Sequence, residues 1–548
     1  METGNVGRRS GQGRRWSTML NEDHYLALTP RRHRSKITPC AVFILLPVLA
    51  FGKDYFTAAV FEHRPRGEFP QEPKTIITNN LRFYDKAAKV AAEKGTDIIL
   101  FNEYGIFPYV LKDTRDNMRQ FMEYIPDPKK IVFNPCVEEV KDRTILYTLS
   151  CIARSNKIYV VANMGDIQPC EGTCDSEKVE ECSVKCPSDD VFMYNTDVAF
   201  DREGNLVAKY HKGHLYMELL NTPEPEFVTF KTDFGVFGMI VCFDSVFQES
   251  VMLAEQGIDT LLFPTFWFDD VFALNAVEWQ QSWALANKVN FFAANTQTPG
   301  LGSLGSGIYS KFDGALVYTY DPDGESKLLI ANVKLREDAK VDTKPSIIII
   351  DETSVNIKDE TGINFPDICF DKIVGEASNL YKDYRCFESL IENYTLVKLT
   401  DPSGKVEACH GGFCCSLAYT ADDMQEDFYF AAFSGINILA DYYQWCEETC
   451  LLIRCDPHEG KPCALFPPNS KTVFRSLEIR GRFSSEKIFP TVSKNKHRLA
   501  PKSEWYHKIS GTEAKLKFRS QENVPLLKAG FLGRCYKRDP PFVPIYEF

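Results

Sequence analysis

The sequence predicts an α/β domain followed by a smaller, mainly-β domain that is rich in cysteine. Two observations predict this fold. From Phe56 to about Arg336, short apolar runs typical of strands alternate with helical patterns, and such alternation is typical of a sheet covered by helices on its faces. From Tyr394 onward the chain is strand-like and dense in cysteine, which indicates a β domain stapled by disulfides.

The elements of the first domain follow from the length and periodicity of each apolar run. A helix is predicted over residues 78–94, where apolar side chains recur at helical spacing at Leu81, Tyr84, Ala87, Ala88 and Ala91. Two further helices are predicted over residues 247–256 and 274–287. Strands are predicted over residues 56–61, 97–101, 158–162, 198–200, 236–241, 260–263 and 291–294.

Changes in this rhythm divide the chain into four parts. We expect an N-terminal extension, the α/β domain, a mixed and polar connecting segment and the mainly-β domain, over residues 1–53, 54–345, 346–390 and 391–548. In the last part, strands are expected over residues 394–399 and 428–433, and an alternating pattern covers residues 473–489.

Composition and charge exclude several classes of protein. Of the 548 residues, 44% are hydrophobic and 25% are charged, which is ordinary for a globular protein. The net charge of −12 argues against a general nucleic-acid binder, because binding to phosphates needs a basic surface. No run of 18 or more apolar residues follows residue 60, so a membrane protein with several spans is excluded.

The N-terminal region predicts entry into the secretory pathway. Four basic residues between positions 31 and 36 precede the apolar run 37–51, as in a signal peptide. Three interpretations of the run are open. It is a cleaved signal if translation starts later, for example at Met19; it is otherwise an uncleaved anchor that would hold the protein at a membrane, or a buried core segment. Because no hydrophobic tail ends the chain, we expect a secreted protein without a GPI anchor. Asn393, in Asn-Tyr-Thr, is a candidate glycosylation site there.

The 18 cysteines also suit an oxidising compartment. Setting aside Cys40 in the apolar run leaves 17, so one thiol remains if all the others pair. Spacing alone does not say which one. A second open question is the group with C-x₃-C-x₇-C-x₃-C spacing at Cys170, Cys174, Cys182 and Cys186, which suits zinc or disulfides. The secretory context favours disulfides.

Cys242 and Glu103 are candidates for catalysis because each follows a predicted strand. A nucleophile at the turn after strand 236–241 would project into the crevice where α/β sheets bind ligands, and nearby amides could hold an oxyanion. Glu103 follows strand 97–101 and reaches the same edge, where desolvation by Tyr104, Phe107 and Tyr109 would raise its pKa toward that of a general base. The alternatives are a buried structural cysteine for Cys242, and an acidic helix N-cap or a solvated loop residue for Glu103.

Lys212 is the third candidate, because a cation near a thiolate and a developing oxyanion stabilises both. Its alternative is a solvated charge cluster. His211 and His214 have a spacing that suits metal binding, but no further Cys or His completes a zinc site. A Ser/His/Asp triad lacks its G-x-S-x-G motif, whereas a Cys-His pair with His63, His211 or His214 as the base is possible in principle.

Taken together, these segments resemble the nitrilase (carbon-nitrogen hydrolase) superfamily, and within it the vanin and biotinidase branch. The resemblance covers residue 54 to near the C-terminus and includes the adjacent cysteines 414 and 415. Its motifs are Thr57–His63, Glu103, Lys209–Lys212, Phe237–Asp244, Phe263–Thr265, Val289–Asn295 and Gly305–Tyr309. Asn102 and Tyr104 depart from the proline and aspartate that relatives commonly carry beside the glutamate, which puts the substrate in doubt more than the reaction.

The resemblance implies an αββα sandwich for the first domain and a role for each site residue. Cys242 would be the nucleophile, Glu103 the general base and acid, and Lys212 the oxyanion stabiliser, with Glu218 in support. The backbone N–H of Phe243 would help to hold the oxyanion. Trp267, a weaker candidate, could line the apolar part of the pocket together with Phe268, Phe272 and Trp279, although aromatic side chains at such spacing equally often pack in a core. Cys242 would then be the free thiol, the other 16 cysteines could form up to eight disulfides, and no metal or organic cofactor would be needed.

The implied activity is hydrolysis of a small-molecule amide through a cysteine thioester. We expect pantetheine as the substrate, with a biotin amide (biocytin) as the close alternative. Two other classes remain open: a non-catalytic secreted binding protein on the same scaffold, and an acyl transferase in which an amine takes the thioester in place of water.

Overall fold

A computed structural model describes residues 53–546, apart from residues 68–70, 108–113, 171–185, 270–271, 323, 342, 356–390, 441 and 459. The N-terminal extension with its apolar run 37–51, as well as Tyr109, Cys174 and Cys182, lies outside the described residues. No helix in the described ranges is long and apolar enough to cross a bilayer.

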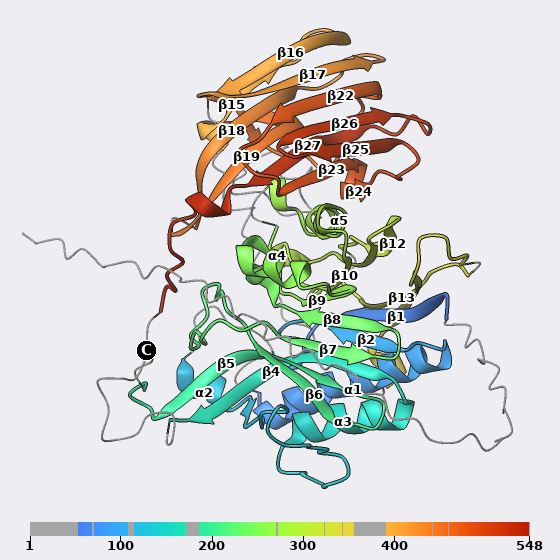
Figure 1. Cartoon of the computed structure of the whole chain (residues 1–548), viewed down its shortest axis with the longest axis vertical. Coiled ribbons are helices and arrows are strands. Elements are labelled where there is room, and N and C mark those ends of the chain that lie inside the picture. The colour runs from blue at the N-terminus through green and yellow to red at the C-terminus, as the bar shows by residue number, and fades with distance from the viewer. Residues whose placement is uncertain are drawn as a thin grey trace, which may run out of the picture. The chain divides into compact units, whose positions relative to one another are not determined.

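Two sheets form the inside of the first domain (Figure 1). The strands of one are β1 Tyr55–Glu62, β2 Ile98–Phe101, β3 Met122–Glu123, β4 Tyr159–Pro169, β5 Val191–Phe200, β6 Leu206–His211, β13 Ser326–Lys334 and β14 Ser346–Ile350. They run in the order β14-β13-β1-β2-β4-β5-β6, with β3 beside β4. The strands of the other are β7 Thr229–Thr232, β8 Gly235–Met239, β9 Thr260–Pro264, β10 Asn290–Ala294, β11 Ser306–Ser310 and β12 Gly314–Thr319. Their order is β12-β11-β10-β9-β8-β7.

Helices cover the outer faces of both sheets. Alternation along β1 shows the layering, because Ala58 and Val60 pack with the strands of the second sheet, whereas Ala59 and Phe61 pack with the helices outside the first. The helices of the domain are α1 Pro73–Glu93, α2 Arg115–Arg119, α3 Thr144–Asn156, α4 Gln248–Glu255, α5 Ala276–Asn287 and the short α6 Glu352–Val355. The predicted αββα sandwich is therefore confirmed.

Several element boundaries differ from the prediction for local physical reasons. Helix α1 begins five residues before the predicted start at residue 78, because Pro73 suits its first turn and the Glu72 carboxylate accepts from the Thr75 N–H at 3.0 Å. The predicted helix 247–256 is preceded by a 3-10 helix over Cys242–Val246. The boundary at residue 345 falls too early, because β14 pairs antiparallel with β13 and extends the sheet into the predicted connecting segment.

The second domain consists of two antiparallel sheets (Figure 1). One contains β15 Thr395–Lys398, β18 Phe428–Leu439, β19 Tyr443–Arg454, β23 Ile488–Lys494, β24 Arg498–Leu499 and β27 Leu526–Arg534. The other contains β16 Ser403–His410, β17 Phe413–Ala421, β22 Phe474–Arg482, β25 Trp505–Ser510 and β26 Glu513–Arg519, and β20 Asp456–His458 pairs with β21 Lys461–Leu465 alone. Their inner faces share one apolar core, so the mainly-β prediction is confirmed.

Six disulfides occur among the described residues. They join Cys136 to Cys151, Cys170 to Cys186, Cys409 to Cys414, Cys415 to Cys450, Cys446 to Cys535 and Cys455 to Cys463. The pairing of Cys170 with Cys186 excludes the alternative of a four-cysteine zinc site, because a disulfide sulfur is no thiolate ligand. Within the described ranges Cys242 is the free cysteine, as the odd count and the resemblance led us to expect.

A buried ion pair joins the two domains. Glu278 of α5 is fully buried, and its Oε2 lies 2.8 Å from Lys528 Nζ of β27 and accepts from Thr491 Oγ1 of β23 at 3.1 Å. Although burial raises the pKa of Glu278, Lys528 and His497 hold it at about 2. The stabilisation from this carboxylate is therefore complete above the ordinary glutamate pKa near 4.5 and is lost as the pH falls toward 2.

Replacing Lys528 by methionine should destabilise the protein by about 3 kcal/mol near neutral pH, because it leaves the Glu278 charge buried without its cation. Urea unfolding followed by fluorescence measures the change. Lys487→Met is the matched control, since Lys487 pairs with the exposed Glu255 across the same two domains and should cost less than about 1 kcal/mol. Equal decreases in the free energy of unfolding of the two variants would contradict the role assigned to Lys528 at the interface.

Candidate active site

Cys242 lies at a strained turn between a strand and a 3-10 helix. It follows β8 and is the first residue of the helix Cys242–Val246. Its φ of 45° falls in the left-handed region, which costs a non-glycine residue about 1–3 kcal/mol and persists only where the surroundings hold it. Asp244 helps to stabilise this conformation, because its Oδ2 accepts from the Val241 N–H at 3.0 Å and from Tyr210 Oη at 2.9 Å.

Glu103 lies beyond the end of β2 and is 1% exposed. Both oxygens of its carboxylate are bound: Oε2 accepts from the Phe266 N–H at 2.6 Å, and Oε1 accepts from Lys212 Nζ at 2.8 Å. Its backbone carbonyl accepts from Thr296 Oγ1 at 2.8 Å. Contacts from three separate stretches of chain therefore hold Glu103 in place, two through its carboxylate and one through its backbone carbonyl.

Lys212 directly follows β6 and is 2% exposed. Its Nζ lies 2.8 Å from Glu103 Oε1 and 2.8 Å from Glu218 Oε2. Glu218 is held in turn, because its Oε1 accepts from Tyr104 Oη at 2.6 Å. The structure thus places Glu103, Lys212 and Glu218 in one buried cluster. Tyr104, the residue after Glu103, contributes a hydrogen bond to it.

Burial and neighbouring charges shift the pKa of Cys242, Glu103 and Lys212. Burial raises the pKa of Cys242, as does the nearby Glu103, so the thiol is protonated at rest although Lys212 opposes the shift. Burial also raises the pKa of Glu103, opposed by Lys212. Burial would lower the pKa of Lys212, but Glu103 and Glu218 raise it well above its ordinary value. The arrangement is a neutral thiol beside a base of raised pKa and a permanent cation.

An apolar pocket opens beside Cys242. Its walls are aromatic or aliphatic and come from both domains: Tyr216, Phe243, Val246, Phe266, Trp267, Phe268, Leu274, Leu439 and Trp445. The indole N–H of Trp267 donates to the Leu274 carbonyl at 2.9 Å, and that of Trp445 donates to Glu447 Oε2 at 2.8 Å. Since both indole donors are engaged elsewhere, the pocket offers mainly apolar surface to a ligand.

Of the other candidates, Phe243, Trp267 and Phe268 line the pocket, whereas Trp279 and the histidines do not. Phe243 is the second residue of the 3-10 helix, where backbone N–H groups have no partner within the helix. The Trp279 Nε1 instead donates to Oγ of Ser245 in the 3-10 helix at 3.0 Å. The histidines considered as bases bind elsewhere: His63 contacts Asn80 and Ser326, His211 contacts Asp166, and His214 contacts Asp244. The Phe272 side chain is outside the described residues.

Asn195 is a site residue that the sequence analysis missed. From β5, its Nδ2 donates to Glu103 Oε1 at 2.7 Å and to Glu218 Oε1 at 2.6 Å. Its Oδ1 accepts from Asn163 Nδ2 at 2.6 Å, which orients the amide so that its donors face the two carboxylates. No pattern around residue 195 marks it, because its partners are 92 and 23 residues away in the chain.

Comparisons with known proteins show the family of the chain. The carbon-nitrogen hydrolase family matches residues 59–338, and the Vanin C-terminal domain matches residues 385–539. The chain therefore belongs to the carbon-nitrogen hydrolase family, whose members hydrolyse carbon-nitrogen bonds other than peptide bonds, and it carries the Vanin C-terminal domain.

Its relatives include two kinds of amidohydrolase. The pantetheinase of Mus musculus is 34% identical over 517 residues, which span 91% of this chain and 93% of the relative. The biotinidase of Takifugu rubripes is 30% identical over 470 residues, or 82% and 88% of the two chains. Among solved structures, an amidase from Nesterenkonia sp. is 21% identical and covers 52% of this chain and 92% of its own, with a TM-score of 0.35.

Replacing Asn195 by leucine should lower the maximal rate of amide hydrolysis at least about tenfold, because Glu103 and Glu218 lose a shared donor. It should also move the acidic limb of the pH–rate profile upward, because a hydrogen bond to the charged form of Glu103 is lost. Asn221→Ala is the control, since Asn221 binds the Met193 N–H of the same strand and no group of the cluster. An unmoved acidic limb in Asn195→Leu would contradict this role.

Proposed function

We propose that this chain hydrolyses pantetheine to pantothenate and cysteamine through a thioester on Cys242. The observation that carries the proposal is the buried pair of the Glu103 carboxylate and the Lys212 ammonium, whose charges act on the free, buried thiol of Cys242. In a non-catalytic binding protein, nothing would require an unpaired thiol, a base of raised pKa and a permanent cation in one cluster.

The first half of the reaction forms the thioester. Glu103 takes the proton of the Cys242 thiol, and the sulfur attacks the amide carbonyl carbon. Lys212 Nζ and the Phe243 N–H stabilise the negative oxygen of the tetrahedral intermediate. As the intermediate collapses, the carbon-nitrogen bond breaks and Glu103 gives its proton to the departing amine.

Water completes the second half. Glu103, again ionised, takes a proton from water as the oxygen attacks the thioester carbonyl. The new intermediate breaks its carbon-sulfur bond and releases the acid, and the sulfur regains its proton from Glu103. Glu218 and Asn195 contact no reacting atom in this scheme. They hold Lys212 and Glu103 in place, so we assign them as positioning residues.

The character of the pocket favours pantetheine over a biotin amide. Pantetheine carries uncharged groups on both sides of its scissile amide, whereas biocytin carries a charged amino acid on the amine side. None of the residues that line the described pocket is charged, and transferring an unpaired charge into such a place is costly. The greater identity to a pantetheinase than to a biotinidase supports the same choice.

The proposed location is extracellular. The six disulfides of the described residues suit an oxidising compartment. Asn393 is exposed at the start of the second domain, where a glycan would meet no packed surface.

Release of amine from equal concentrations of pantetheine and biocytin tests the substrate. We expect kcat/KM for pantetheine to exceed that for biocytin at least about tenfold, given the cost of burying the charged leaving group. Cys242→Ala should lose at least about 10³-fold of this activity. Faster release from biocytin would favour the biotinidase alternative, and release from neither amide would favour the binding protein.

The pH dependence tests the assigned base. Because Glu103 must be ionised to act and its pKa is raised, kcat/KM should fall on the acidic side at a pH above 4.5, the ordinary value for glutamate. Glu103→Gln should abolish the limb together with about 10²–10⁴-fold of the rate. Glu123→Gln is the control, since burial raises the pKa of this β3 residue to about 7 and its carboxylate accepts from the Ile145 N–H of α3 rather than binding the cluster. If the acidic limb of the profile disappeared in Glu123→Gln and persisted in Glu103→Gln, Glu103 would not be the base.

A further inference from the structure

Arg534 is a buried arginine of the second domain that contacts the helix carrying the nucleophile. It is the last residue of β27, and its side chain is 0% exposed. Its Nε donates to the Val246 carbonyl at 3.1 Å. Val246 ends the 3-10 helix that begins at Cys242. One guanidinium from the second domain therefore binds the far end of the nucleophile turn.

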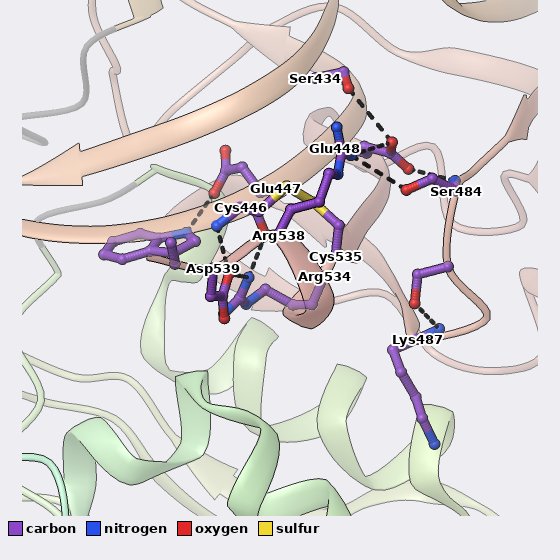
Figure 2. Close-up of a disulfide and its surroundings, with 12 residues drawn as sticks. Ser434, Cys446, Glu447, Glu448, Ser484, Lys487, Arg534, Cys535, Arg538 and Asp539 are labelled. Carbon is purple, nitrogen blue, oxygen red and sulfur yellow. Dashed lines mark hydrogen bonds and ion pairs between the residues drawn. A yellow bond between two sulfur atoms is a disulfide. The ribbon is translucent and has the colours of Figure 1, made fainter. Parts of the chain in front are cut away.

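The rest of this guanidinium is held firmly in place. Its Nη2 and Nη1 lie 2.8 Å and 3.1 Å from the two carboxylate oxygens of Asp539, and Nη1 also donates to the Cys446 carbonyl. Asp539 in turn accepts from the Cys446 N–H at 2.6 Å. Figure 2 shows Arg534 and Asp539 side by side next to the disulfide between Cys446 and Cys535. Because that disulfide ties β19 to the residue after Arg534, the guanidinium has little freedom to swing away.

The contact matters because the turn is strained. The φ of Cys242 is 45°, and such a conformation persists only where its surroundings hold it. Asp244 binds the start of the turn through the Val241 N–H. At its end, the last carbonyls of a helix lack partners within the helix, and a buried carbonyl needs a donor. Arg534 supplies that donor for Val246, so the turn is fixed at both ends, once from each domain.

We propose that Arg534 is a positioning residue for amide hydrolysis and acts through Val246 on the geometry of Cys242 and the Phe243 N–H. This inference rests on the proposed function of the same site. Arg534 does not line the pocket, so its role is to hold the nucleophile and the oxyanion donor where the reaction needs them. Through Arg534, the second domain thereby supports the catalytic arrangement, although Arg534 itself does not contact the substrate.

Kinetics of Arg534→Met and Arg538→Gln test this role. Arg538 is the matched control, because it lies beside the same disulfide but contacts Glu448 and Ser484 of its own domain (Figure 2). In Arg534→Met, kcat should fall about 10- to 100-fold, as expected for a small displacement of reacting groups, while KM stays within about twofold. Arg538→Gln should keep both values. A purely structural role would lower the unfolding temperature of Arg534→Met but leave the kcat of its folded fraction unchanged, and that result would overturn the proposal.

Two further measurements cover the other outcomes. Where Arg534→Met does not fold, Asp539→Asn is the second variant. It keeps the shape of the residue 539 side chain but weakens its contact with the Arg534 guanidinium, so we expect a smaller loss of kcat. Alkylation of Cys242 by iodoacetamide needs no amide substrate, so it tests the positioning even if the parent protein hydrolyses neither amide. We expect at least about fivefold slower labelling in Arg534→Met, because the thiol loses its alignment with Glu103 and Lys212. Parental labelling rates in both variants would overturn the inference, whereas an inactive parent alone would overturn the proposed function.

Discussion

The buried contact between Lys212 and its two carboxylates is the interaction on which the site depends. Removing a cation from water is costly, and the cost is offset only when partners are close and the remaining hydrogen-bonding groups are satisfied. Glu103 and Glu218 each lie 2.8 Å from Lys212 Nζ, and Asn195 binds both carboxylates. Because these groups come from different strands, the cluster can form only when the whole sheet edge is assembled.

The same requirement explains why the nucleophile is a turn residue. Cys242 reaches the cluster at the end of β8 in a left-handed conformation that its own sequence does not favour. The neighbouring elements hold it there: Asp244 binds the start of the turn, the Phe266 backbone contacts the Cys242 sulfur, and Arg534 binds the Val246 carbonyl at the end of the turn. The second domain is thus part of the support of the site, and its strands β18 and β19 supply Leu439 and Trp445 to the pocket wall.

Much of the fold followed from periodicity. Short apolar runs located the strands on both sides of the site, and helical spacing located the helices α1, α4 and α5. Helix α3 and the edge strands of the first domain's sheets were missed. Helix α3 lacked a strong start signal, since no side chain caps it at Arg143. The strand β14 was missed although four of its five residues are isoleucine, because it opens a segment whose overall composition is polar; as an edge strand it leaves Ile347 and Ile349 exposed. The start of α1 depended on a glutamate cap, which is a less usual choice than serine or aspartate.

The sequence by itself determined the residue types of the site and their place at strand ends, because a short apolar run followed by a polar residue marks the edge of a sheet wherever the strand lies. It also determined that one thiol would be left over, since 17 cysteines cannot all pair. Only the tertiary structure decided which distant groups meet there. Asn195, Tyr104 and Arg534 act through contacts with residues 23 to 288 positions away, and no local pattern records a partner at such a distance.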